Sequence, residues 1–74
     1  MKFPSVEIVN ILKKNYPEGA RVELVIMNDP NGIEEGTKGT VVGVDDVGTI
    51  HVNWDNGRRL GCAFGEDYCK VVSA

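Results

Sequence analysis

The 74-residue sequence has little of what metal-dependent and membrane proteins require. It contains a single histidine, His51, and two cysteines, Cys62 and Cys69, without a Cys-x-x-Cys pair. This spacing is not typical of a zinc site, so we expect neither a metal nor a cofactor. No stretch approaches the roughly 18 apolar residues of a membrane span, and no apolar N-terminal region precedes a small-residue cleavage site. We therefore expect a cytoplasmic protein that does not bind membranes.

The groups that carry catalysis are also scarce. There is no second histidine, no glycine-rich loop between a strand and a helix, and no serine or cysteine with an evident base as partner. Most acidic residues fall in segments rich in turn formers, where their side chains bind the backbone. We expect no enzyme activity. For Cys62 and Cys69 we favour free, partly buried thiols that act as small hydrophobes, with a disulfide as the alternative.

Basic residues are too few and too scattered for general nucleic-acid binding. The net charge is −3, with 8 Lys and Arg against 11 Asp and Glu. Non-specific binding to phosphate backbones depends on clustered basic side chains, and Arg58-Arg59 is the main cluster in the expected sheet. A chain of this length forms one domain near the lower limit of independent folding, so we also expect a homo-oligomer.

Apolar residues alternate in a way that predicts short strands separated by glycine turns. In residues 49–54, Ile50, Val52 and Trp54 share one face, while His51 and Asn53 share the other. The same reasoning predicts an amphipathic helix over 4–15, strands over 21–27, 41–44, 49–54, 58–63 and 68–72, and a long polar loop over 28–36.

These elements favour a mainly β protein: a small SH3-like, five-stranded, partly open barrel with one N-terminal amphipathic helix. The division would be residues 1–15 for the helix and 16–74 for the barrel. The helix would pack on its own barrel or on another subunit. Gly61 lies inside the fourth predicted strand, which indicates a bulge or a close backbone approach.

Three runs of sequence resemble a known family: YPEGARVELVIMNDP, GTKGTVVGVDDVGTIHVNWDNGRRLG and GEDYCKVV. The chain is similar, over about residues 16–72, to the domain-of-unknown-function family 4314, which is common in phages, plasmids and conjugative elements of Gram-positive bacteria. Residues 36–41 and 52–57 are more distantly similar to SH3-like modules of the KOW and Mib/Herc2 kinds. The resemblance implies a binding module from a mobile element, and it transfers no catalytic residues.

The candidate binding residues lie on the polar face of the third strand and near it. They are His51, Asn53, Trp54, Arg58, Arg59 and Tyr68. One of the two arginines should lie close to the polar row, where a guanidinium could bind phosphate or carboxylate. Trp54 is either a core residue or a stacking surface, and Tyr68 is similarly open. The candidate partner-binding residues of the loop are Asp29, Asn31, Glu34 and Glu35.

We predict a non-enzymatic module that binds, and can thereby inhibit, a host or phage protein with a basic surface. One alternative is an oligomeric sponge for a small nucleotide signal of anti-phage defence. Arg58 and Arg59 would then hold phosphate, with Trp54, Tyr68 or His51 stacked on the base. The second alternative is a KOW-like contact with RNA.

Overall fold

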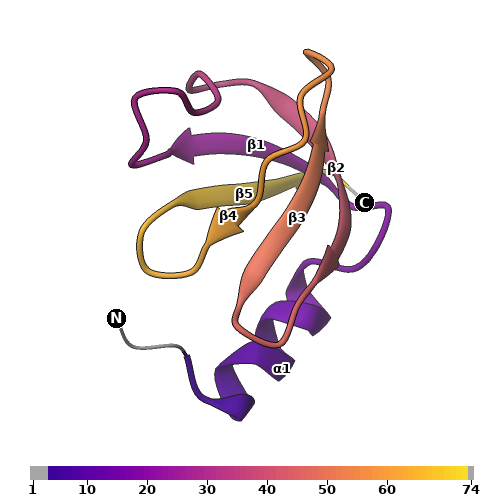
Figure 1. Ribbon diagram of the computed structural model, residues 1–74. Helices are drawn as coiled ribbons and strands as arrows, with labels where there is room; N and C mark the ends of the chain where they lie inside the picture. The colour runs from indigo at the N-terminus through magenta and orange to yellow at the C-terminus, as the bar shows by residue number, and fades with distance from the viewer. Residues whose placement is uncertain (1–3, 74) are drawn as a thin grey trace.

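The computed structural model describes residues 4–73 and shows one helix and five strands in a single antiparallel sheet (Figure 1). The strand order is β4-β3-β2-β1-β5. The elements are α1 (Val6–Asn15), β1 (Arg21–Ile26), β2 (Lys38–Val44), β3 (Thr49–Trp54), β4 (Cys62–Ala63) and β5 (Tyr68–Ser73). The predicted mainly β class, with five strands and one N-terminal helix, is confirmed.

The core forms where the alternating apolar faces of the strands meet. β1 buries Val22 and Leu24, and β3 buries Ile50, Val52 and Trp54, as the period-two pattern predicts. The remaining buried core comes from the helix, the loop and the other strands: Leu12, Ala20, Ile33, Val41, Cys62 and Cys69. The two cysteines are free thiols, as we favoured.

The fourth strand is shorter than predicted. Instead of 58–63 it comprises only Cys62–Ala63, preceded by an isolated bridge between Arg59 and Asn53. The Trp54 indole N–H donates to the carbonyl of Leu60 at 2.9 Å. The Leu60 carbonyl is therefore bound by a side chain of β3. Gly61 allows the close backbone approach: a Cβ there would lie 2.5 Å from the methyl carbon of Thr49. The glycine therefore marks the point where the regular strand is interrupted.

The helix covers one end of its own sheet (Figure 1). Ser5 caps it by accepting a hydrogen bond from the Ile8 amide at 3.3 Å, and Leu12 enters the core. Tyr16, at the C-cap, donates its hydroxyl to the carbonyl of Cys69 at 2.7 Å. Burial raises the pKa of Tyr16 to about 12. Lys13 adds an exposed ion pair with Asp46, 3.0 Å apart. This helix is too short to span a membrane.

The sheet curls until its edge strands, β4 and β5, lie next to each other across the turn of residues 64–67. Asp67 stabilises this end of the fold. One carboxylate oxygen accepts from the Ala63 amide at 3.1 Å and the other from the Asn28 amide at 2.8 Å. The Asp67 carboxylate thus links the end of β4 to the loop that follows β1, close to the place where β4 and β5 meet.

Candidate binding groove beside strand β3

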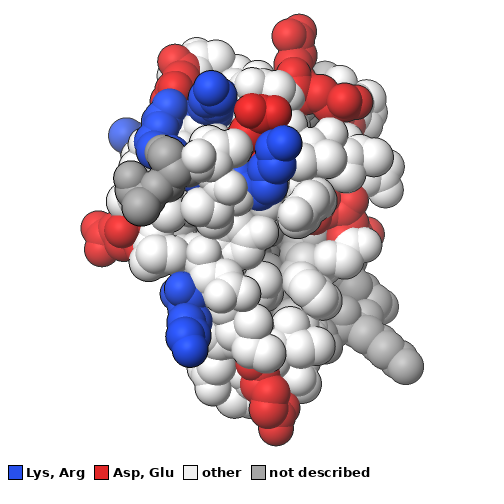
Figure 2. Space-filling model, turned by 180° about the vertical axis from the view of Figure 1, so that it is seen from behind, with Lys and Arg blue, Asp and Glu red and all other residues white. Residues whose placement is uncertain are grey.

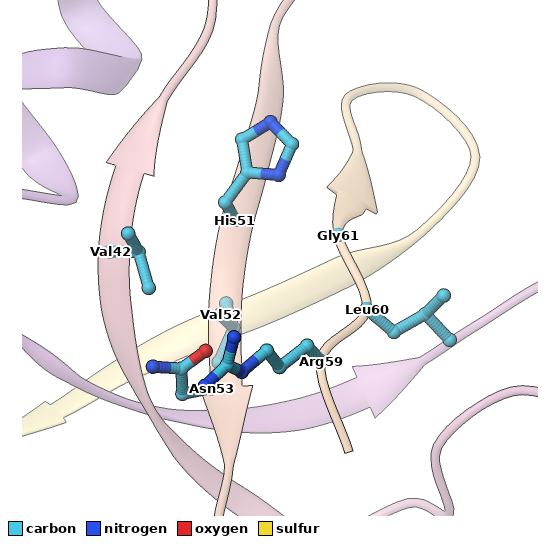
Figure 3. A pocket seen from close by; sticks show the side chains of 7 residues that line it. All are labelled: Val42, His51, Val52, Asn53, Arg59, Leu60 and Gly61. Carbon is cyan, nitrogen blue, oxygen red and sulfur yellow. The ribbon is translucent and has the colours of Figure 1, made fainter.

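A groove of about 390 Å³ lies on the outer face of β3 (Figure 3). Its walls come from β2, from β3 and from the irregular segment before β4. The lining residues are Val42, His51, Val52, Asn53, Arg59, Leu60 and Gly61. Figure 3 shows His51 and Asn53 on β3, with Val42 on one side and the segment of residues 59–61 on the other. The groove therefore combines three polar side chains with three apolar ones.

A β-bulge in β2 accounts for the apolar wall. Val41 pairs with Val52, but the next pairing joins Gly43 to His51, so Val42 is the extra residue between them. A bulge bends its strand and re-aims the side chain. Val41 is buried, whereas Val42 remains 49% exposed beside the polar row of β3.

His51 is oriented by a carboxylate outside the groove. Its Nε2 lies 2.8 Å from Asp45 Oδ2, while Asp45 Oδ1 accepts from the amides of Val47 and Thr49. The pKa of Asp45 is lowered, first by the Thr49 amide and also by His51 and the Val47 amide, with desolvation acting in the opposite direction. An ionised carboxylate only accepts hydrogen bonds, so His51 Nε2 carries the hydrogen and Nδ1 is the acceptor of the neutral ring.

The Nδ1 atom of His51 is the one that faces the groove. It lies 3.7 Å from the position that a Cβ on Gly61 would occupy, and Gly61 lines the groove. In the neutral ring, His51 therefore offers an acceptor to a ligand. When protonated, it offers a second donor.

Asn53 and Arg59 lie together at the other end of the groove. Their backbones form an isolated antiparallel bridge, and the Arg59 side chain extends across β3 toward Asn53 (Figure 3). Within residues 4–73, the ion pairs involve Lys13, Arg21 and His51, and neither Asn53 nor Arg59 makes a side-chain hydrogen bond. An amide and a guanidinium with donors available thus share one concave surface.

Arg58 has a different position although it adjoins Arg59 in the chain. Its guanidinium donates to the carbonyls of Asn31 at 2.7 Å and Gly32 at 3.0 Å. Its backbone amide donates to Asn56 Oδ1 at 3.0 Å, which closes the preceding turn. Arg58 therefore holds the loop of residues 28–36 against the segment that leads into the groove. The prediction that one of the two arginines lies near the polar row applies to Arg59.

Two of the predicted ligand contacts lie elsewhere. Trp54 is only 3% exposed, and its indole N–H is used by Leu60. The ring of Trp54 therefore lies in the core, which is one of the two roles that the sequence left open. Tyr68 is exposed, but it lies in edge strand β5, where it pairs with Ile26 of β1, and it does not line the groove.

The loop of residues 28–36 is held in place by hydrogen bonds to its backbone amides and by one side chain that packs in the core. Ile33 is buried, while Asp29, through its side chain and carbonyl, accepts from the amides of Asn31 and Gly32, both at 2.9 Å. The predicted loop residues are all exposed: Asp29, Asn31, Glu34 and Glu35. Asp29 and Asn31 shape the turn, which leaves Glu34 and Glu35 as outward carboxylates.

Charges of both signs are mixed over the surface. Figure 2 shows basic and acidic side chains interspersed around a wide uncharged area on the face opposite to that of Figure 1. Arg21 contributes to this pairing because its two terminal guanidinium nitrogens, Nη1 and Nη2, donate to the two carboxylate oxygens of Asp55, and that contact lowers the pKa of Asp55. Within residues 4–73, no three His, Cys, Asp or Glu side chains are grouped in a way that could hold a metal ion.

The site also depends on residues that sequence reasoning did not assign to it. Val42 stands in a run of β-branched residues that was predicted to be a strand, and its place in the groove depends on the bulge in β2. Asp45 appeared only as a turn former, and its contact with His51 depends on how the hairpin closes. For Gly61 the sequence left a bulge and a close backbone approach open, and the structure shows the close approach.

The sequence matches the family model "Domain of unknown function (DUF4314)" over residues 5–72. The chain belongs to this family. No curated protein and no solved structure matches it.

Proposed function

We propose that this protein is a non-enzymatic binding module whose groove beside β3 receives a segment of another protein. The observation that carries the proposal is the pair formed by Asn53 and Arg59, two donor side chains that share the groove without a partner in residues 4–73. A groove with a few convergent polar groups and an apolar wall is the usual form of a recognition site. The finer fold assignment, an SH3-like barrel, is part of the same proposal and is supported by the curled five-stranded sheet.

The groove fits a carboxylate next to an aliphatic side chain. A guanidinium binds a carboxylate through two parallel hydrogen bonds, and the Asn53 amide can add a third donor. Val42 offers the exposed aliphatic surface beside them. An acceptor at His51 Nδ1 would suit a backbone amide of the same segment. The site would thus recognise a short peptide segment by its carboxylate, its aliphatic side chain and its backbone amide, and not by net charge alone.

The loop extends this surface with the opposite charge. Arg58 fixes the loop beside the groove segment, and Glu34 and Glu35 are exposed on it. A partner that presents basic side chains around a recessed carboxylate would be complementary to both parts. The resemblance to mobile-element proteins supports the setting: a phage- or plasmid-encoded protein that binds and inhibits a host protein in the cytoplasm.

The test compares two variants that each remove one positive charge. Immobilised wild-type protein, Arg59→Ala and Lys14→Ala are incubated with lysate of a Gram-positive host, and captured proteins are quantified by mass spectrometry. Loss of a charge-assisted hydrogen bond weakens binding by about 10- to 100-fold. We expect Arg59→Ala to lose the specific partner and Lys14→Ala, on the exposed face of α1, to keep it. Equal capture by all three would contradict the proposal.

The nucleotide sponge is the alternative. Of the residues proposed to hold the nucleotide, only some line the groove. Arg58 is bound to the loop and Trp54 is buried, so His51, Asn53 and Arg59 remain as the groups that could hold a nucleotide. Native mass spectrometry with a panel of cyclic and linear nucleotides would reveal a stoichiometric adduct and the oligomeric state together. Such an adduct, lost in Arg59→Ala, would replace the protein-binding proposal. RNA contact would instead show a steep dependence on salt.

A further inference from the structure

Cys62 and Cys69 occupy the two edge strands of the sheet. In the order β4-β3-β2-β1-β5 these strands stand at opposite ends, so no backbone ladder of the described sheet joins them. Cys62 pairs with Ile50 of β3, and Cys69 pairs with Leu24 of β1. Because the sheet curls, both thiols point into the same core, where each is 1% exposed.

We propose that Cys62 and Cys69 form a site of reversible oxidation, at which a hydroperoxide converts the two thiols into a disulfide that closes the seam between β4 and β5. This site is separate from the groove and does not depend on the proposed function. It covalently joins strands that now meet only through side chains and through the turn of residues 64–67.

The two thiols are close enough to affect each other's ionisation. The hydrogen bond between them lowers the pKa of the Cys69 thiol, because the Cys62 S–H stabilises a thiolate at Cys69. The same hydrogen bond, together with burial, raises the pKa of Cys62. Cys69 is therefore the thiol that reacts first, and Cys62 is the one that resolves the intermediate.

The reaction balances with hydrogen peroxide as the hydroperoxide. The Cys69 thiolate attacks one peroxide oxygen, so an S–O bond forms, the O–O bond breaks, and water leaves once the second oxygen is protonated. Cys62 then loses its proton and attacks the sulfur of the Cys69 sulfenic acid. The S–S bond forms, the S–O bond breaks, and a second water leaves. The thiols lose two electrons and the peroxide gains them.

Access to the buried pair comes through the turn that joins the two strands. β4 has only two residues, and Phe64, Gly65 and Glu66 of the turn are exposed. Short edge elements with few backbone hydrogen bonds open locally at low cost. A peroxide molecule can reach the thiols in such an opening, and the disulfide then prevents the seam from opening again.

The experiment treats folded wild-type protein with hydrogen peroxide, removes the oxidant, denatures the protein and alkylates it with N-ethylmaleimide. We expect a monomer whose intact mass is about 2 Da lower, with no maleimide added, and full return of both thiols after dithiothreitol. Closing so short a loop raises the Tm by about 15 °C in a domain of this size. A thermal scan before and after oxidation measures this rise.

Cys62→Ala and Cys69→Ala serve as matched controls, and neither should show the loss of mass. A parallel oxidation of wild-type protein unfolded in urea keeps the test decisive if these variants do not fold. Maleimide labelling of both thiols after oxidation of the folded protein would overturn the proposal. So would a disulfide that forms only in urea or only between molecules, or a Tm that falls on oxidation.

Discussion

Gly61→Ala is the substitution that best tests how the groove is built. The new Cβ would lie 2.5 Å from Thr49 Cγ2, with the Ile50 carbonyl oxygen at 3.5 Å. The Thr49 side chain must turn or the segment of residues 59–61 must move away from β3. Movement of the segment would stretch the hydrogen bond from the Trp54 indole to the Leu60 carbonyl. The groove would then lose the wall that carries Arg59.

The expected cost follows from these two responses. Overpacking of a well-packed site costs about 1–3 kcal/mol, and a hydrogen bond of this kind contributes about 1 kcal/mol. We expect the free energy of unfolding to fall by about 1–3 kcal/mol, depending on whether Thr49 turns or the segment moves. For a domain of this size, that corresponds to a fall in Tm of roughly 5–20 °C. Urea unfolding, followed by the fluorescence of Trp54, measures the loss directly.

Gly43→Ala is the matched control. A Cβ at Gly43 meets nothing within 4 Å, and Gly43 pairs with His51 across the same hairpin. We expect its stability to remain within about 0.5 kcal/mol of wild type. Thr49→Ser removes the methyl group that the new Cβ meets, so it should restore much of the stability of Gly61→Ala in the double variant. Equal stability of the two alanine variants, or no rescue by Thr49→Ser, would refute the reasoning.

Two further predictions concern the groups that orient His51 and the loop. The folded pKa of Asp45 is lowered, so its carboxylate contributes stability above the unfolded pKa of about 3.9, and that contribution is lost as the pH falls through the folded value. The urea concentration at the midpoint of unfolding should therefore change less between neutral pH and pH 2 in Asp45→Asn than in Asp46→Asn. An equal change of the midpoint in the two variants would contradict this. Arg58→Ala removes two hydrogen bonds to loop carbonyls. It should accelerate amide hydrogen exchange in residues 28–33, which Arg59→Ala should leave unchanged, while stability falls by no more than about 1 kcal/mol.

Local patterns were sufficient to predict most of the fold. The alternation in residues 49–54 assigned Ile50, Val52 and Trp54 to the core, because successive side chains of a strand point to opposite faces. The helix followed from its apolar spacing, which depends on residues within one or two turns, and the structure adds that Ser5 caps it. The fourth strand was predicted too long because backbone pairing depends on the partner strand, not on local composition.

The arrangement of the groove shows where such reasoning ends. Arg58 and Arg59 are identical and adjacent, yet one binds carbonyls of a distant loop and the other lies over Asn53. No local pattern distinguishes them, because the choice is made by backbone that only the closed sheet brings near. The bulge at Val42 likewise appears only when β2 is aligned with β3.

The sequence by itself determined the class of fold, the apolar and polar faces of the strands, the turns and the scattered placement of the basic residues along the chain. These properties depend on side-chain period and on the conformational preferences of neighbouring residues. Only the tertiary structure decided which polar groups keep their donors available and which are used internally. It also brought Cys62 and Cys69 together, because closing the sheet joins strands at opposite ends of its order.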